Sequence, residues 1–213
     1  MEGLFAGIDS GSSTTKAILY GGGRILSHAI IPTGHHVRES ADKVLAKVLE
    51  FAGGRNNRLK YIITTGYGRR SISFGNRSIP EIICHAKGAC FLSNCLSGVI
   101  DIGGQDSKVI RLDEKGEIID FMMNDKCAAG TGRFLEVMAN AMELHLEELG
   151  PVSLKSKDPC KISNTCTIFA ESEVIALRAE GRSREDLVAG VHDAVASRVA
   201  IMATANALRG KVM

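Results

Sequence analysis

The feature that most constrains the fold is a short motif that occurs twice, 92 residues apart. An Asp-x-Gly sequence begins at residue 9 and again at residue 101, and a lysine follows seven residues after each aspartate. In both copies strand-type segments flank a short turn that contains glycine, which is typical of a β-hairpin. We therefore expect two homologous domains, over residues 1–97 and 98–213.

Hydrophobic patterning predicts the remaining elements. In the first half, strands are expected over 4–9, 16–20, 24–31 and 59–65. A helix capped by Ser40 is expected to stop at Gly53-Gly54, and a second helix is expected over 81–96. In the second half, strands are expected over 99–103 and 117–122, and helices over 131–145, 169–179 and 183–208, with a loop over 150–166. Thr131 is expected to cap the first of these helices, and Ser183 the last. No strand is expected after the last helix, so the second domain of this α/β fold is expected to be incomplete.

Composition excludes several classes of protein. The net charge is +2, aromatic residues make up 5% and there is no Trp, so we expect no nucleic-acid partner. No apolar run of membrane-spanning length and no signal peptide are visible, so we expect no membrane partner and a cytoplasmic location. The six cysteines include no Cys-x-x-Cys pair, and thiols or metal ligands are therefore favoured over disulfides.

The two turns have the composition of phosphate-binding loops. Small residues let backbone N–H groups approach a phosphate, and hydroxyls add donors. Asp9 and Asp101 stand where a carboxylate could hold hydrated magnesium. The candidate phosphate-binding residues are Gly11, Ser12, Ser13, Thr14, Thr15 and Lys16 in the first turn, and Gly103, Gly104 and Gln105 in the second. The alternative is a pair of ordinary Gly/Ser hairpins in which both aspartates only form turns.

Cys127 and Cys166 each lie just before a predicted helix start. A helix N-terminus favours a thiolate through its dipole and its unpaired N–H groups. Two thiolates are half of the set that a 4Fe–4S cluster needs, and a two-fold dimer would complete it. The alternatives are small buried residues or a zinc site with His partners; Cys160 could compete as a ligand, but we interpret it as structural. The other cysteines are interpreted as core or surface thiols: Cys84, Cys90 and Cys95.

Several longer segments of the sequence resemble those of a known family. Residues 8–16 and 100–108 resemble the phosphate motifs of the actin/hexokinase/Hsp70 ATPase superfamily. Gly-Gly-Gln-Asp-Ser-Lys at 103–108 and Asn-Asp-Lys-Cys-Ala-Ala-Gly-Thr-Gly-Arg-Phe at 124–134 resemble the activator, component A, of 2-hydroxyacyl-CoA dehydratases and the related ATPase subunits of benzoyl-CoA reductases, the BadF/BadG/BcrA/BcrD type. The resemblance covers essentially the whole chain.

The resemblance implies an ATP-dependent iron–sulfur activator that uses Mg. Asp9 and Asp101 would bind Mg through water, and Gln105 or Asp106 would orient the attacking water. Cys127 and Cys166 would hold one 4Fe–4S cluster shared between the two subunits of a homodimer. The electron would come from a ferredoxin or flavodoxin and pass to a 2-hydroxyacyl-CoA dehydratase or benzoyl-CoA reductase-type partner.

Family members continue beyond the last helix with a strand, a Gly-Gly turn and a helix that hold the adenosine. No Gly-Gly pair follows residue 104 here, so a C-terminally truncated copy is expected. Two alternatives stay open. One is a sugar or acyl kinase on the same fold, for which residues 33–80 offer only Asp42 as a catalytic aspartate. The other is a truncated paralogue that binds the cluster without hydrolysing ATP.

Overall fold

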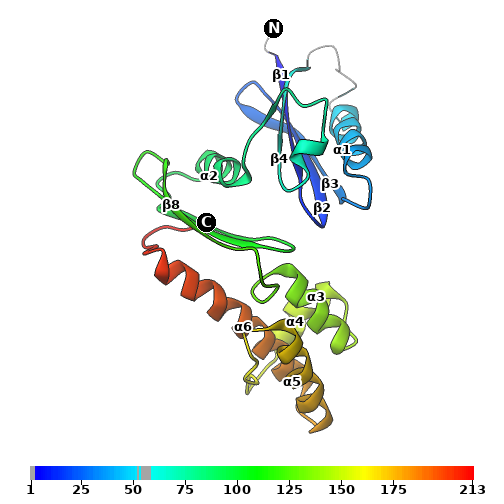
Figure 1. The fold of residues 1–213 in the computed structure, drawn as a ribbon, viewed down its shortest axis with the longest axis vertical. Coiled ribbons are helices and arrows are strands. Elements are labelled where there is room, and N and C mark those ends of the chain that lie inside the picture. Colours follow the sequence, from blue (N-terminus) through cyan, green and yellow to red (C-terminus); the bar gives the residue numbers. More distant parts are fainter. Residues whose placement is uncertain (1–2, 52, 54–58) are drawn as a thin grey trace. The chain divides into compact units, whose positions relative to one another are not determined.

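The computed structural model describes residues 3–51, 53 and 59–213. The chain forms two compact units, Met1–His85 and Ala86–Met213, and the division falls within helix α2 (Glu81–Leu92). Each unit contains one β-sheet, and helices pack against it (Figure 1). The fold is therefore α/β, as the sequence predicts.

The first unit is a five-stranded sheet with the order β3-β2-β1-β4-β5. Strands β1 to β3 form an antiparallel meander, and β4 and β5 continue the sheet in parallel from β1. Helix α1 (Val37–Phe51) packs on one face, where its Val44 and Val48 meet Ile8 and Leu19 in a core that solvent does not reach (Figure 1). The strands are β1 Leu4–Ser10, β2 Thr14–Gly21, β3 Arg24–Pro32, β4 Leu59–Thr65 and β5 Arg77–Ser78, and a short helix, η2, covers Arg69–Ser71.

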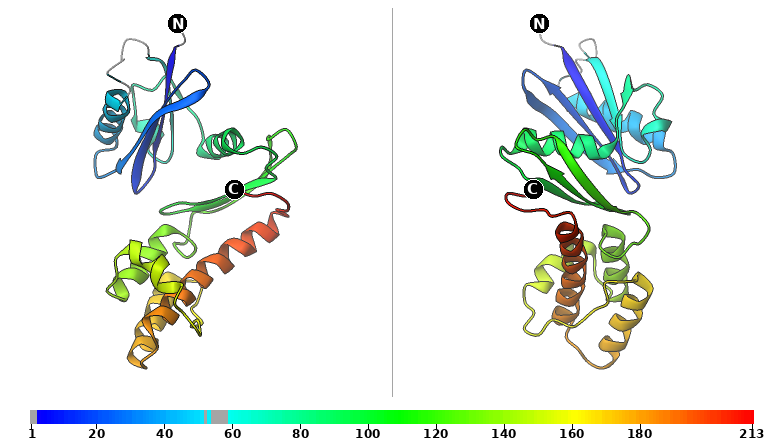
Figure 2. Two further views of the ribbon diagram at one scale, coloured as in Figure 1. Left: turned by 180° about the vertical axis from the view of Figure 1, so that it is seen from behind. Right: turned by 60° about the vertical axis from the view of Figure 1, so that its left-hand side comes forward.

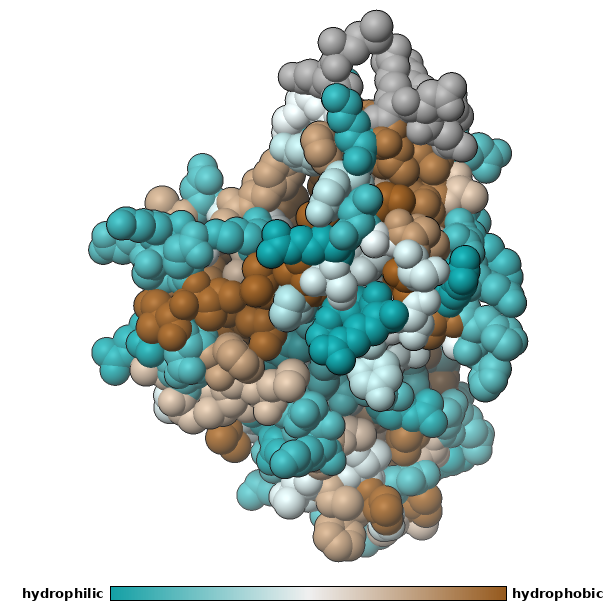
Figure 3. All heavy atoms as spheres, turned by 45° about the horizontal axis from the view of Figure 1, so that its top comes forward, coloured by the Kyte–Doolittle hydropathy of each residue, from teal (hydrophilic) through white to brown (hydrophobic). Residues whose placement is uncertain are grey.

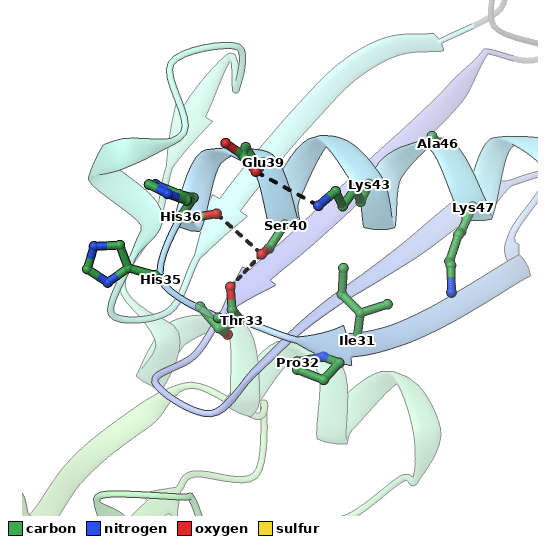
Figure 4. A pocket seen from close by; sticks show the side chains of 11 residues that line it. Ile31, Pro32, Thr33, His35, His36, Glu39, Ser40, Lys43, Ala46 and Lys47 are labelled. Atoms are coloured by element: carbon green, nitrogen blue, oxygen red, sulfur yellow. Dashed lines mark hydrogen bonds and ion pairs between the residues drawn. The ribbon is translucent and has the colours of Figure 1, made fainter.

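Ser40 is not the cap of α1, because the helix begins at Val37. Its side chain is buried in the first turn and donates to the carbonyl oxygen of Thr33 and, at 3.3 Å, to that of His36 (Figure 4). The hydroxyl thus ties the segment after β3 to the helix instead of capping a free N-terminus. The predicted stop at Gly53-Gly54 lies partly outside the described residues.

The second unit combines a three-stranded antiparallel meander, β6-β7-β8, with a group of helices at one end of the sheet (Figures 1 and 2). Phe134, Met138, Val174, Leu187 and Val191 are at most 1% exposed and form the centre of the helical core. The elements are β6 Gly98–Ile102, β7 Ser107–Leu112, β8 Ile118–Asn124, α3 Gly132–Ala141, η3 Leu146–Glu148, α4 Leu149–Ser153, α5 Thr167–Ala179 and α6 Arg184–Ala205.

Several predicted bounds in the second unit are wrong. Helix α3 ends at Ala141, α2 ends at Leu92, and the short helix α4 begins the segment that was predicted to be a loop. No strand follows α6 among the elements of the described chain, as the sequence predicts, but the last residues make an isolated pairing with β6. The amides of Ser97 and Ile100 donate to the carbonyls at 211 and 213, and Gly98 pairs with Val212 in a parallel bridge, so the chain continues beside β6. Short pairing of this kind leaves no hydrophobic alternation to recognise.

Helix α6 is the one helix of the described chain that is long and apolar enough to cross a membrane, by length and composition alone. In this structure 44% of the apolar 18-residue stretch of α6 is buried. Leu187, Val191 and Val195 belong to the core that α6 shares with α3 and α5. Ser183 caps the helix as predicted, since its hydroxyl accepts from the Asp186 amide. Apolar side chains also reach the surface in several places on the face shown in Figure 3.

Candidate functional site

The two copies of the motif fold into equivalent hairpins, which we name hairpin 1 (residues 9–16) and hairpin 2 (residues 101–108). Asp9 lies directly opposite Lys16 across β1 and β2, and Asp101 lies directly opposite Lys108 across β6 and β7. Both turns are closed by an equivalent backbone bond, of 3.0 Å in hairpin 1 and 2.8 Å in hairpin 2. The repeat of sequence is therefore a repeat of structure.

Hairpin 1 presents its lysine to solvent. Lys16 Nζ lies 3.1 Å from Asp9 Oδ2, and the Lys16 side chain is 43% exposed, so it can leave the carboxylate and reach a phosphate. Ser12 and Ser13 are exposed at the tip of the turn. Thr15 differs from the other candidates, because it is fully buried and its hydroxyl lies 3.0 Å from that of Thr33.

Gly66, just after β4, packs against the Asp9 carboxylate of hairpin 1. It has a φ of +87°, and a Cβ built there would lie 2.4 Å from Asp9 Oδ1 and 2.5 Å from the carbonyl oxygen of Ser10. A residue with a side chain would have to displace Asp9 and strain its own backbone. Glycine at this position therefore fixes where the Asp9 carboxylate can lie.

Hairpin 2 has a different electrostatic design. Lys108 is 2% exposed, and its ammonium lies 3.2 Å from Asp101 Oδ2 and 2.7 Å from Asp106 Oδ1. In hairpin 1 the position of Asp106 is occupied by Thr14. Hairpin 1 thus has one carboxylate and one reachable cation, whereas hairpin 2 has two carboxylates around one buried cation and carries a net charge of −1. Gln105 is exposed at the tip of hairpin 2.

Beside hairpin 1 the structure contains an apolar cavity of about 390 Å³. Asp9, Lys16 and Thr65 line it together with apolar side chains of β1 and β2. Cys84 also lies there; burial raises the pKa of its thiol, and a hydrogen bond with Thr65 opposes the shift. This thiol is therefore poorly suited to ionise.

A second groove of about 610 Å³ lies between the end of β3 and α1, in the same unit (Figure 4). His35 and His36 are exposed at one end, and Lys43 makes an ion pair of 3.8 Å with Glu39 on the helix surface. No group of three or more His, Cys, Asp or Glu side chains able to hold a metal ion occurs in the described part of the chain. Thr33, which lines this groove, also bonds to Thr15 and Gly11 of hairpin 1.

The two candidate cluster cysteines come together within the second unit. Cys127 Sγ lies 3.4 Å from the carbonyl oxygen of Thr165, the residue before Cys166. Cys166 occupies the N-cap position of α5, and Cys127 lies in the loop that leads to α3. Both thiols are partly exposed, and neither is in a disulfide. The hydroxyl of Thr167, directly after Cys166, is buried without a hydrogen-bond partner.

Cys160 is built into the core instead. It is 6% exposed, and its sulfur accepts a hydrogen bond of 3.2 Å from Arg182 Nε. A Cβ on Gly190 would lie 2.1 Å from the Cys160 carbonyl oxygen, so the backbones pack closely here. Among the other thiols Cys84 and Cys90 are partly exposed and Cys95 is exposed.

Sequence reasoning missed two residues that hold the Cys127 loop (residues 125–131). Asn124 Nδ2 donates to the carbonyl oxygens of Cys127 and Ala129, both at 2.9 Å, and Ser107 Oγ donates to that of Gly130 at 2.5 Å. Alignment of the two hairpins could have drawn attention to Ser107, which takes the place of the buried Thr15. Nothing in the sequence pattern distinguishes Asn124 from a residue at an ordinary strand end.

Comparison with known proteins agrees with this geometry. The sequence profile of the "BadF/BadG/BcrA/BcrD ATPase family" matches residues 6–213. The activator of lactoyl-CoA dehydratase from Anaerotignum propionicum is 45% identical over 208 residues, which are 97% of this chain and 80% of that protein.

Two solved structures are also similar. The Acidaminococcus fermentans (R)-2-hydroxyglutaryl-CoA dehydratase component A superposes with a TM-score of 0.94 at 40% identity, over 99% of this chain and 81% of that one. The activator of 2-hydroxyisocaproyl-CoA dehydratase from Clostridium difficile, with bound ADPNP, superposes with a TM-score of 0.91 at 41% identity, over 100% and 78%. The fold is thus that of the actin-like ATPases, as the sequence predicts.

Proposed function

The chain belongs to the BadF/BadG/BcrA/BcrD ATPase family, and from this premise we propose that it is an ATP-dependent activator that delivers low-potential electrons to an acyl-CoA-processing partner. One observation carries the proposal: a duplicated Asp–Lys hairpin and two partly exposed thiols, brought to adjacent loops, occur in one chain. The hairpins supply phosphate chemistry, and the thiols supply a place for a redox group.

We propose a division of labour between the hairpins. Lys16, with the backbone and hydroxyls of Gly11 to Thr14, holds nucleotide phosphates, because its ammonium is reachable and only one carboxylate competes for it. Asp9 and Asp101 hold magnesium through water, and Gly103 and Gly104 let the backbone of hairpin 2 approach. The net negative charge of hairpin 2 suits a hydrated divalent cation better than a bare phosphate.

Gln105 is the better candidate to orient the attacking water. The Asp106 carboxylate is engaged by the buried Lys108 ammonium at 2.7 Å, whereas the Gln105 side chain is exposed at the turn. An amide can donate to one oxygen and accept from another, which is what positioning a water beside a phosphate requires. Asp106 then serves to fix the hairpin together with Asp101.

The donor set at Cys127 and Cys166 fits half of a 4Fe–4S cluster. Thiolates are the ligands that such clusters take, and four are needed. Since the described residues contain no third cysteine beside these two, a second copy of the chain would complete the set, as in a homodimer. When bound, the cluster would accept and pass on one electron. The N–H groups at the start of α5 and the orphaned Thr167 hydroxyl are donors available toward cluster sulfur.

The remaining partners follow from the proposed chemistry. A ferredoxin or flavodoxin would supply the electron, and a 2-hydroxyacyl-CoA dehydratase or a benzoyl-CoA reductase-type enzyme would receive it. All of these are expected in the cytoplasm. ATP binding would favour one arrangement of the activator over another, and hydrolysis would reset it.

Anaerobic purification tests the proposal. The wild-type chain should be brown, contain about four irons per dimer and hydrolyse Mg·ATP. Cys127→Ser and Cys166→Ser should each lose the iron–sulfur absorbance, while Cys160→Ser, which changes a buried thiol bonded to Arg182, should keep it. Wild-type iron content in Cys127→Ser would refute the cluster assignment, and a colourless wild type would favour the kinase alternative. A brown protein without ATPase activity would instead identify the non-hydrolysing paralogue.

A further inference from the structure

Two cross-strand neighbours, one in hairpin 2 and one in β8, hold the Cys127 loop. Ser107, in β7, pairs with Asn124, in β8. Ser107 is 2% exposed and donates to the Gly130 carbonyl, and Asn124 donates to the carbonyls of Cys127 and Ala129. One pair of opposing side chains thus satisfies three carbonyls of one short loop.

The turn of hairpin 2 reaches the other end of the same loop through its backbone. The amides of Gly132 and Arg133, the first two residues of α3, donate to the carbonyls of Gly103 and Gly104 at 2.9 and 2.8 Å. The first amides of a helix have no partner within the helix, so the turn supplies partners that they need. Thr131 is the N-cap but makes no side-chain cap bond; its hydroxyl donates to the Ala128 carbonyl.

Among the described residues, hairpin 1 makes no equivalent connection to a loop that carries a cysteine. The buried hydroxyl at the matching position, on Thr15, bonds to Thr33, and Thr33 in turn donates to the Gly11 carbonyl at 2.8 Å. These bonds tie hairpin 1 to the segment after β3, and Ser40 of α1 in turn donates to the Thr33 carbonyl. The asymmetry means that, of the two hairpins, hairpin 2 is the one bonded to a cysteine loop.

We propose that Ser107 and Asn124 are positioning residues that couple the nucleotide state of hairpin 2 to the conformation of the Cys127 loop. The proposal rests on the proposed function and deepens it. Hydrogen bonds, of which that of Ser107 is buried and those of Asn124 are partly buried, link the phosphate turn, the loop and the first turn of α3, so a shift of the turn must move the loop or break those bonds. From Cys127 the contact to Thr165 extends the linkage to the segment that carries Cys166.

Hydrogen exchange read by mass spectrometry tests the coupling. Anaerobically purified full chain is compared without nucleotide, with Mg·ADP and with the non-hydrolysable analogue Mg·AMPPNP. In the wild type, Mg·AMPPNP should slow exchange in peptides covering 101–108 and in those covering 125–136. In Ser107→Ala and Asn124→Ala the slowing in 101–108 should remain, and that in 125–136 should fall by about fivefold, the weight of one hydrogen bond in an opening equilibrium.

Matched variants separate coupling from general loosening. Ser107→Thr should keep the response, since a threonine fills the equivalent site in hairpin 1 as Thr15. Ser153→Ala removes a hydroxyl-to-carbonyl bond elsewhere in the same unit, to Gly150, and should also keep it. If the variant at the buried Ser107 does not fold, Asn124→Ala still tests the hydrogen bonds to the Cys127 loop, because Asn124 is partly exposed.

The possible failures are distinguishable. Slowing confined to 101–108 in the wild type, or a full response of 125–136 in both alanine variants, would overturn the coupling while leaving the proposed function intact. A wild type in which neither hairpin responds to either nucleotide would overturn the proposed function and the coupling with it.

Discussion

Lys108 Nζ donates to Asp106 Oδ1 at 2.7 Å, and the Lys108 side chain is 2% exposed. The side chain of its counterpart in hairpin 1, Lys16, is 43% exposed. A buried cation that is paired with two carboxylates is a structural part of the hairpin. A half-exposed cation with one carboxylate partner contributes little to stability and is available to a ligand. The duplicated motif has therefore been put to two uses.

Lys108→Met and Lys16→Met should accordingly have opposite signatures. Lys108→Met leaves Asp101 and Asp106 without their cation and should lower the free energy of unfolding by about 2–4 kcal/mol. Lys16→Met should change the free energy of unfolding by less than about 1 kcal/mol and should raise the KM for ATP. Urea unfolding and steady-state ATPase assays measure the two effects. Equal loss of stability in both variants would contradict the assigned asymmetry.

The hairpins were predictable because their signal is local. The equal Asp-to-Lys spacing and the small turn residues can be recognised from the few residues on either side of Gly11 and Gly103. Pairing of the two strands then places each lysine opposite its aspartate. The different burial of Lys16 and Lys108 was not predictable in this way, because it depends on elements packed around each hairpin and not on the motif.

The hydrogen bonds at the helix starts also could not be predicted from local sequence. Ser40, Thr131 and Ser183 have similar capping signals in the sequence, yet of the three only Ser183 accepts from a helix amide. Ser40 and Thr131 donate to nearby carbonyls instead. A serine or threonine hydroxyl can do either, and tertiary contacts decide which bond forms.

Gln105→Ala should slow hydrolysis without weakening nucleotide binding. If the Gln105 amide orients water, its loss should lower kcat about 100-fold and leave the KM for ATP nearly unchanged. Asp106→Asn is the comparison, since it weakens the bond to Lys108 and should lower stability as well as kcat. A normal kcat in Gln105→Ala, with a reduced one in a well-folded Asp106→Asn, would transfer the role to Asp106.

Gly66→Ala should damage magnesium-nucleotide binding from outside hairpin 1. The new Cβ would meet Asp9 Oδ1 at 2.4 Å and would sit on a backbone with a φ of +87°. We expect a loss of about 1–3 kcal/mol in the free energy of unfolding and a higher KM for Mg·ATP. Gly88→Ala, in α2, is the matched control, because no atom lies within 4 Å of a Cβ built at this position. Alanine there should stabilise the helix by about 0.5–1 kcal/mol.

Unchanged Mg·ATP kinetics in Gly66→Ala would show that the Asp9 carboxylate can move without consequence. It would then not be a magnesium-holding group.

Asp186, at the start of α6, should make stability depend on pH in the acid range. Asp186 Oδ1 accepts from Ser156 Oγ at 2.7 Å and from the amides of Lys157 and Asp158 at 3.0 Å. The Ser156 hydrogen bond, together with these amides, holds the pKa of the Asp186 carboxyl well below its usual range. These bonds fasten the segment that leads from α4 toward Cys166 to the N-terminus of α6.

The sign follows from proton linkage. The unfolded chain takes up a proton at Asp186 near pH 4, while the folded chain resists it, so the contribution of Asp186 is fully present above that pH and is lost as the pH falls below it. Asp186→Asn should therefore be clearly less stable than the wild type at pH 7, and the difference should shrink between pH 4 and pH 2. Urea unfolding of both proteins at several pH values measures it, and Ser156→Ala should show a smaller version of the same trend. A wild-type advantage that stays constant down to pH 2 would mean that the hydrogen bonds to Asp186 do not depend on its charge.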